Sequence, residues 1–343
     1  MVVNIPTIGL GMIVKNEAVD LPLCLQSFLP SVNVVVLVDT GSTDRTIEIA
    51  KTILEASKCR HEIVECRDFN DEAGQLTDFS AARNQYVSRL EKYDVDYLMS
   101  CDADDTLVTP DVASALAKEP ADFYGIKYRM NDNMWFNSYK IWRRHLKVRY
   151  DGRVHEVLHI DWTKVVKDIQ SVEFLHHWSV VEGQENSTQR NLRILRGEIY
   201  PPLRSLFYFA NENVDAVNYV EAVKWYLEYI RRVKSGEDTW PVELAHCYFR
   251  AARWCQHLGD TDTAVMLSKE LLAKDPSWSE SWCELAYIAR LRGDVKAMKE
   301  YCLKALNNQF KPRLFSEHDK YTTTPATMLQ VARLMEKEPP SVG

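Results

Sequence analysis

VNVVVLVDTGSTDRTIEIAK, at residues 32–51, determines the fold class that we expect for this chain. Its run of valine and leucine is unbroken up to Asp39, which is typical of a strand that is buried on both faces. The residues TGST then form a turn, in which Ser42 or Thr43 can cap a helix that begins near Asp44. A doubly buried strand followed directly by a helix predicts one unit of a parallel α/β sheet.

The same order of strand and helix continues on both sides of this segment. Further strand-like stretches share its apolar character and lie at residues 8–14, 61–66 and 96–100. Helical patterns lie between them and end near Phe28, Leu54 and Leu90. Strands that alternate with helices imply crossover connections, so we expect a Rossmann-like, mainly parallel sheet.

Polar residues cluster where three of these strands end. The clusters are Lys15–Asn16–Glu17, residues 39–44 and residues 102–105. In open α/β sheets, ligands gather beyond the carboxyl ends of the strands. The coincidence of three such ends predicts one functional site at this edge of the sheet.

Asp102 and Asp104 are the first candidates for chemistry at that edge. Two carboxylates one residue apart can bind Mg²⁺ or Mn²⁺, which also takes oxygen from substrate phosphates. The ion would offset the charge that builds on a diphosphate leaving group. The alternative is an acidic surface turn in which Asp105 caps the next helix.

A basic segment, KIWRRHLKVRYDGRVHE, occupies residues 140–156. It is either a solvated strand face or a positive wall that faces a phosphate-bearing donor. Arg143 and Arg144 are the candidates for contacts with a diphosphate, because a guanidinium group can bind phosphate oxygens in pairs.

The composition is that of a globular protein with about two domains. The 343 residues are 46% hydrophobic and carry a formal net charge of -7. This charge argues against a protein that coats nucleic acid or an anionic membrane, because phosphate binding needs a positive field. We expect a cytoplasmic protein with reduced thiols, no signal peptide and no membrane span, since the eight cysteines form no CxxC pair and no long apolar stretch occurs.

The last third of the chain changes character and repeats. Gly259–Asp260 and Gly293–Asp294 lie 34 residues apart, each at a turn between two amphipathic helices. This period resembles tetratricopeptide repeats. We therefore expect an all-α domain at 201–338 after an α/β domain at 1–200. Its helices would present a peptide acceptor along a groove or join two copies into a homodimer.

Several ordered motifs together resemble the inverting family 2 glycosyltransferases of GT-A fold, in the subgroup that carries tetratricopeptide-like helices. The motifs are GMIVKNEAVDLPLCLQSF (11–28), VVVLVDTGSTDRTIEIAK (34–51), FSAARNQYV (79–87), YLMSCDADDTL (97–107) and YDGRVHEVL (150–158). The similarity spans about residues 5–200. It implies transfer of a sugar from a nucleotide-sugar donor, with UDP as the nucleotide that relatives commonly use.

The resemblance also implies roles for individual residues. Asp39 would bind the uracil or ribose, and Glu17 would line the same pocket. Arg83, the first residue of the family's "RN" pair, would contact the donor. Asp102 and Asp104 match the family's metal-binding DxD motif, with the ion bridging the donor diphosphate.

The general base and the third metal ligand have two candidates each. Glu156 is the first candidate for the base, and Asp151 is the second, because the family more often uses an aspartate. Either His176 or His177 could complete the metal shell, with His177 favoured by register. The alternative for these histidines is a satisfied place in the core.

The expected reaction is a single displacement that inverts the anomeric centre of the sugar. The acceptor would be a peptide, protein or glycan, while the acidic balance weighs against nucleic acid. One alternative is a nucleotidyltransferase, although no glycine-rich loop with a lysine occurs near the N-terminus. The other is an inactive scaffold whose helices bind a partner protein.

Overall fold

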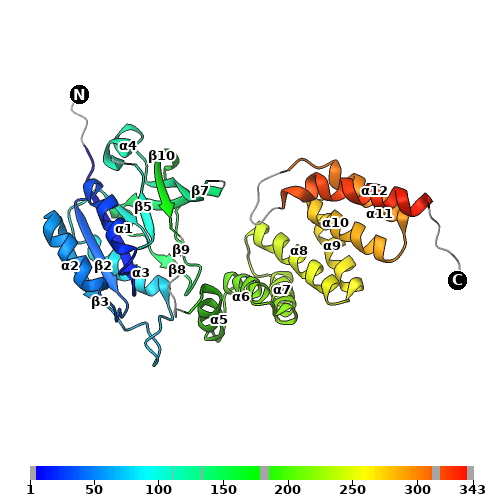
Figure 1. The fold of residues 1–343 in the computed structure, drawn as a ribbon, viewed down its shortest axis with the longest axis horizontal. Helices are drawn as coiled ribbons and strands as arrows, with labels where there is room; N and C mark the ends of the chain where they lie inside the picture. The colour runs from blue at the N-terminus through cyan, green and yellow to red at the C-terminus, as the bar shows by residue number, and fades with distance from the viewer. Residues whose placement is uncertain (1–4, 110, 133, 178–184, 311–316, 338–343) are drawn as a thin grey trace. The chain divides into compact units, whose positions relative to one another are not determined.

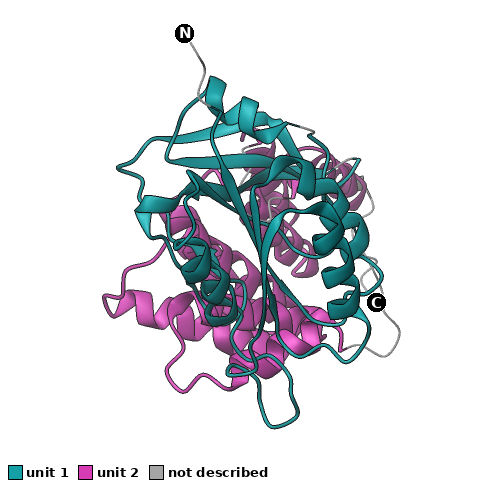
Figure 2. Ribbon diagram, turned by 90° about the vertical axis from the view of Figure 1, so that its left-hand side faces the viewer, with its two compact units in different colours: residues 1–184 teal, residues 185–343 magenta. Residues whose placement is uncertain are grey.

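The computed structural model describes residues 5–109, 111–132, 134–177, 185–310 and 317–337. Contacts divide the chain into two compact units, residues 1–184 and 185–343 (Figure 2). Unit 1 is α/β and unit 2 is all-α, which confirms the predicted order of fold classes. The domain bounds expected from the sequence, 1–200 and 201–338, stay a prediction.

Unit 1 is built on an eight-stranded sheet with the strand order β3-β2-β1-β4-β7-β6-β10-β5. Its strands are β1 (Ile8–Val14), β2 (Val34–Asp39), β3 (Arg60–Glu65), β4 (Tyr97–Ser100), β5 (Asp105–Leu107), β6 (Phe123–Asn131), β7 (Met134–Arg143) and β10 (Val166–His176). The first four strands in this order, β3, β2, β1 and β4, each pair in parallel with the next. Strand β7 pairs antiparallel with both β4 and β6. A small hairpin of β8 (Tyr150–Asp151) and β9 (Val157–Leu158) lies outside this sheet.

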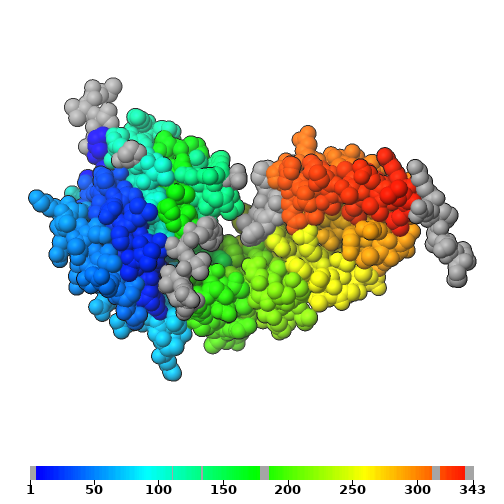
Figure 3. Space-filling model, viewed as in Figure 1, coloured from blue at the N-terminus to red at the C-terminus, as the bar shows by residue number. Residues whose placement is uncertain are grey.

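Helices cover both faces of the sheet. They are α1 (Leu21–Phe28), α2 (Thr46–Ser57), α3 (Phe79–Leu90) and α4 (Val112–Lys118). The β2 side chains alternate between two hydrophobic clusters: Val35 and Leu37 pack with α1 and α2, while Val34 and Val36 pack with α3. This double burial explains the unbroken apolar run of β2. Figure 3 shows the surface of α1 and α2 in blue.

The contact between α3 and β1 requires a glycine. A Cβ atom at Gly11 would lie 2.1 Å from Cδ2 of Tyr86, a fully buried side chain of α3. The missing side chain therefore lets the tyrosine ring lie directly on the strand, which sets the position of α3 above the sheet.

Unit 2 consists of consecutive antiparallel helices (Figure 1). They are α5 (Ser187–Arg196), α6 (Leu203–Asp215), α7 (Tyr219–Lys234), α8 (Pro241–His257), α9 (Thr261–Lys274), α10 (Ser279–Leu291), α11 (Val295–Leu306) and α12 (Thr323–Lys337). Gly259 and Gly293 adopt positive φ angles of 91° and 71°, and the aspartate after each caps the next helix. The two turns are thus equivalent, as the 34-residue period predicts. Among the described helices, none is both long and apolar enough to cross a membrane.

Candidate active site

The parallel register places the predicted polar clusters at one edge of the sheet. Val14 at the end of β1 pairs with Asp39 at the end of β2, and Gly11 pairs with Ser100 at the end of β4. The residues that follow these strands, including Glu17 and Asp102, therefore emerge at the same edge. The structure brings together the three clusters that the sequence indicated.

Asp39 lies in a closed turn at this edge. Its Oδ1 atom accepts hydrogen bonds from the backbone nitrogen of Ser42 (2.9 Å) and from the Ser42 hydroxyl (2.6 Å). The neighbouring loop is joined to the turn by Asn16, whose side chain accepts a bond from the nitrogen of Thr43 (2.7 Å). Among the described residues, both bonds to the Asp39 side chain use Oδ1, which leaves Oδ2 to accept a bond from a ligand.

The raised pKa of Glu17 indicates an excess of negative charge at the site. Burial, followed by the charges of Asp104, Asp20, Asp102 and Asp44, raises the pKa of Glu17 to about 7. A carboxyl group ionises less readily where other carboxylates surround it. The edge of the sheet is therefore short of positive charge, which favours the binding of a cation.

Asp102 is compensated by two cations of the protein. Arg83 Nη2 donates to Oδ1 (2.6 Å) and Lys140 Nζ donates to Oδ2 (3.1 Å). Burial alone would raise the pKa of Asp102, but Arg83 and Lys140 hold it well below its usual range. Asp102 therefore stays ionised, with both of its oxygen atoms engaged.

Asp104 and Asp105 form a second group with His176. Their ligand atoms all lie within 4.8 Å of one another. Asp105 is fully buried, and its Oδ1 accepts a hydrogen bond from the hydroxyl of Tyr128 (2.6 Å) and lies 3.1 Å from His176 Nδ1. Burial raises the pKa of Asp104 to about 6; the charge of His176 opposes this shift, and the charges of Asp102 and Asp105 add to it. Carboxylate oxygens and an imidazole nitrogen in an undercompensated acidic pocket fit a divalent ion.

The two candidate histidines face different surroundings. His176 Nδ1 lies 3.6 Å from Asp104 Oδ1, whereas His177 Nε2 lies 2.8 Å from the hydroxyl of Thr106. The backbone nitrogen of His177 donates to the carbonyl of Asp104 (2.8 Å). Successive residues of a strand point to opposite faces, so only one of the pair can face the acidic group. The structure places His176 there, whereas the register expected from the sequence favours His177.

Glu156 joins the site through Arg83. Arg83 Nε donates to Glu156 Oε1 (2.5 Å), so a single guanidinium group connects this glutamate to Asp102. Asn84, the second residue of the "RN" pair, fixes the β8–β9 hairpin by exchanging hydrogen bonds with the backbone of Tyr150 (2.9 and 3.0 Å). Asp151 lies in the same hairpin, where its exposed side chain accepts a bond from the nitrogen of Gly152.

The structure does not bring Arg143 and Arg144 to the acidic group. Because β7 runs antiparallel to β4, Arg143 pairs with Tyr97 at the start of β4, at the opposite end from Asp102. Arg143 lies 3.7 Å from Asp122, and Arg144 donates to the carbonyl of Val95 (2.7 Å). The basic residue of this strand that reaches the site is Lys140, which the sequence analysis did not single out.

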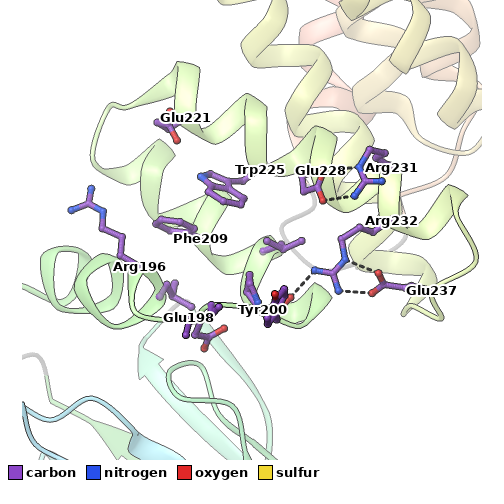
Figure 4. A pocket seen from close by; sticks show the side chains of 14 residues that line it. Arg196, Glu198, Tyr200, Phe209, Glu221, Trp225, Glu228, Arg231, Arg232 and Glu237 are labelled. Carbon is purple, nitrogen blue, oxygen red and sulfur yellow. Dashed lines mark hydrogen bonds and ion pairs between the residues drawn. The ribbon is translucent and has the colours of Figure 1, made fainter.

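Unit 2 contains a separate pocket of about 720 Å³ between the α5–α6 connection, α6 and α7 (Figure 4). Trp225 and Phe209 form part of its wall, with their ring centroids 5.0 Å apart. Two of its arginines are neutralised in ion pairs, Arg231 with Glu228 and Arg232 with Glu237, and the remaining charged side chains, Arg196, Glu198 and Glu221, are one arginine and two glutamates. This pairing leaves little unbalanced charge for a diphosphate, so the acidic edge of unit 1 is the better candidate for catalysis.

Comparisons with known proteins agree with this assignment of unit 1. Residues 10–165 match the family model described as "Glycosyl transferase family 2". The chain is 25% identical over 223 residues to the SPbeta prophage-derived glycosyltransferase SunS of Bacillus subtilis (strain 168) and to glycosyltransferase SunS of Bacillus phage SPbeta, covering 60% of this chain and 49% of each relative. It is 38% identical over 101 residues to the TPR repeat-containing protein Synpcc7942_0270 of Synechococcus elongatus, covering 29% of this chain and 21% of that protein. The chain thus spans about half the length of the two SunS relatives and a fifth of the third.

Proposed function

We propose that this protein transfers a sugar from a nucleotide-sugar donor to an acceptor, because residues 10–165 match the model of glycosyl transferase family 2. The observation that carries the proposal is the acidic edge of the sheet, where Arg83 and Lys140 bond to Asp102, whereas Asp104 has only the titratable His176 beside it among the ion pairs of the described residues. Such an arrangement can bind a divalent ion and a diphosphate side by side.

The nucleoside of the donor would bind near Asp39 and Glu17. Asp39 has a carboxylate oxygen available in a fixed turn, and Glu17 follows the neighbouring strand. These groups can accept hydrogen bonds from a base or ribose. We propose UDP as the nucleotide, on the resemblance to family members that use it.

A divalent ion would be held by Asp104 and His176, with Asp105 beside them. The imidazole ligand favours Mn²⁺ over Mg²⁺, which prefers oxygen ligands alone. The ion, when bound, would neutralise negative charge on the departing nucleoside diphosphate. Arg83 would add a fixed positive charge on the other side of Asp102.

Glu156 is the proposed general base, with Asp151 as the alternative. The acceptor nucleophile would attack C1 of the sugar as the bond from C1 to the diphosphate oxygen breaks, and its proton would pass to the base. Arg83 fixes Oε1 of Glu156, which leaves Oε2 to receive the proton. This single displacement inverts the configuration at C1.

A peptide or protein is the acceptor that we propose, with a glycan as the alternative. Met134, Trp135 and Phe136 are consecutive apolar residues near the tip of the β6–β7 hairpin, and each is about half exposed. Phe136 packs on Tyr128, with ring centroids 5.4 Å apart, and the Tyr128 hydroxyl bonds to Asp105. Exposed apolar groups of this kind mark interaction surfaces. They suit the side chains of a peptide better than the hydroxyl groups of a glycan.

The helical unit would serve acceptor binding or dimerisation. Deletion of residues 201–343 separates the two roles if donor hydrolysis, peptide glycosylation and size in solution are measured in parallel. Loss of peptide glycosylation with unchanged size supports acceptor binding. A change from dimer to monomer supports dimerisation.

A thermal-shift screen of nucleotide sugars, with and without Mn²⁺, tests the proposed activity first. We expect stabilisation by UDP-sugars that depends on Mn²⁺, because a ligand that binds only the folded state raises the melting temperature. The product of a positive donor is then identified by NMR. Release of UDP with an inverted sugar supports glycosyl transfer, whereas release of pyrophosphate would show nucleotidyl transfer and overturn the proposal.

A further inference from the structure

Lys140 owes its position to an irregularity of β7. In the pairing of β6 with β7, Tyr124 pairs with Ile141 and Gly125 pairs with Tyr139, so Lys140 is the extra residue of a β-bulge. Bulges interrupt the alternation of a strand and can direct a side chain toward an active site. This bulge places the ammonium group of Lys140 among the acidic residues.

The contacts of Lys140 are those of a buried counter-ion. Its side chain is 15% exposed, and Nζ lies 3.1 Å from Asp102 Oδ2 and 3.9 Å from Asp105 Oδ2. It also lies over the ring of Tyr128, 5.2 Å from the centroid. Burial alone would lower the pKa of Lys140, but Asp102 and Asp105 keep it above its usual value, so the group is positively charged at neutral pH.

The hydrogen bond to Lys140 changes what Asp102 can do. With Arg83 on Oδ1 and Lys140 on Oδ2, both oxygen atoms of Asp102 are already engaged. An ammonium group has three donors, and one of them is used on Asp102. Lys140 therefore retains donors for a second anion, while an ion that coordinated Asp102 would lie against the positive charges of Lys140 and Arg83.

On the basis of the proposed function, we propose that Lys140 is a donor-binding residue that contacts the diphosphate together with the divalent ion. Its positive charge also disfavours coordination of that ion by Asp102. Neutralisation of the leaving group is then divided between an ion at Asp104 and His176 and a cation that belongs to the protein. The two carboxylates of the DxD motif have different tasks: Asp104 binds the ion, and Asp102 positions Lys140 and Arg83.

Two affinities of the Lys140→Met variant test this division. Calorimetry with UDP at saturating Mn²⁺ should show a loss of about tenfold, as expected when a charge-assisted hydrogen bond to a phosphate is removed. Titration of Mn²⁺ alone, followed by the EPR signal of the free ion, should show binding about threefold tighter or more. The second change is expected because the site loses a positive charge that lies beside Asp102 and repels the ion.

Lys127→Met is the matched control. Lys127 lies on the neighbouring strand β6 and pairs with Glu173 (3.0 Å), away from the acidic group, so neither affinity should change. Lys140→Arg keeps the charge and should retain most of the UDP affinity. Circular dichroism and the melting temperature establish that each variant is folded. If Lys140→Met does not fold, the comparison of Lys140→Arg with Lys140→Gln takes its place.

The outcomes separate this inference from the proposed function. Unchanged UDP affinity in folded Lys140→Met, or weaker Mn²⁺ binding, would overturn the role of Lys140 while the wild type still binds UDP with Mn²⁺. Failure of the wild-type protein itself to bind UDP with Mn²⁺ would instead remove the proposed donor.

Discussion

Binding of Mn²⁺ should weaken steeply between pH 7 and pH 5, because protons compete with the ion for the same side chains. Burial and the neighbouring aspartates raise the pKa of Asp104 to about 6. Burial and the surrounding carboxylates raise the pKa of Glu17 to about 7. His176 also gains a proton more readily than usual: burial opposes this, but its bond to Asp105 and the nearby aspartates raise its pKa. The two carboxyl groups must lose their protons to become negative, and His176 must lose its proton to offer a nitrogen to the ion.

The size of the effect follows from these values. A carboxyl group with a pKa near 6 is about nine-tenths ionised at pH 7 and about one-tenth ionised at pH 5, so Asp104 alone weakens binding about tenfold. Glu17 takes up a proton over the same interval and makes the loss larger, and the raised pKa of His176 acts in the same direction. A pair of ordinary surface carboxylates, with a pKa near 4, would stay ionised at pH 5 and show almost no change.

The assay is EPR titration of free Mn²⁺ at pH 5, 6, 7 and 8, with circular dichroism to show that the fold persists at pH 5. Glu17→Gln removes a neighbouring negative charge, so the midpoint of the pH dependence should move to lower pH. Asp104→Asn should weaken binding at every pH and flatten the profile. An affinity of the wild type that is constant from pH 5 to pH 8 would refute the reasoning.

Three further predictions concern single contacts. Arg83→Met should lower the free energy of unfolding by about 3 kcal/mol, because it leaves two carboxylates without their counter-charge. Adding Glu156→Gln to this variant should recover about 1 kcal/mol, since it removes one of these charges. An unchanged midpoint of urea unfolding in Arg83→Met would contradict the prediction. Glu156→Gln should slow sugar transfer about 10²–10⁴-fold at unchanged UDP affinity. Asp151→Asn should change the rate less than about tenfold, and the reverse order would assign the base to Asp151. Gly11→Ala should destabilise the protein by about 1–3 kcal/mol, since its Cβ would lie 2.1 Å from the Tyr86 ring; an unaltered melting temperature would show that the ring can move freely.

The parallel half of the sheet could be predicted because its signal is local. The run that ends at Asp39 has no polar interruption, and the structure buries every residue of β2. Once β1, β2 and β4 are parallel neighbours, their ends must meet at one edge, so the meeting of Glu17, Asp39 and Asp102 follows from the order of elements alone. No detailed knowledge of side-chain packing is needed for that step.

The remaining residues of the site depend on details that the sequence does not display. The choice between His176 and His177 depends on the register of β10 against β5, in which His176 pairs with Asp105, and a shift of one residue would exchange the two rings. From the sequence alone, Arg143 and Arg144 are expected to contact the diphosphate because the basic segment, residues 140–156, is considered as one surface. In the structure β7 runs antiparallel to β4, which carries these arginines away from the carboxyl ends of the parallel strands.

Charge compensation is the property that distinguishes the two carboxylates of the DxD motif. Asp102 and Asp104 are equivalent in the sequence, yet Arg83 and Lys140 bond to the first, while the second lies 3.6 Å from His176. An ion attracted to this edge gains more from the carboxylate whose charge is not already neutralised, because displacing Arg83 or Lys140 would leave a buried cation without its partner. The bulge at Lys140 therefore does more than add a positive charge. By occupying one aspartate, it determines which of the two is left for the metal.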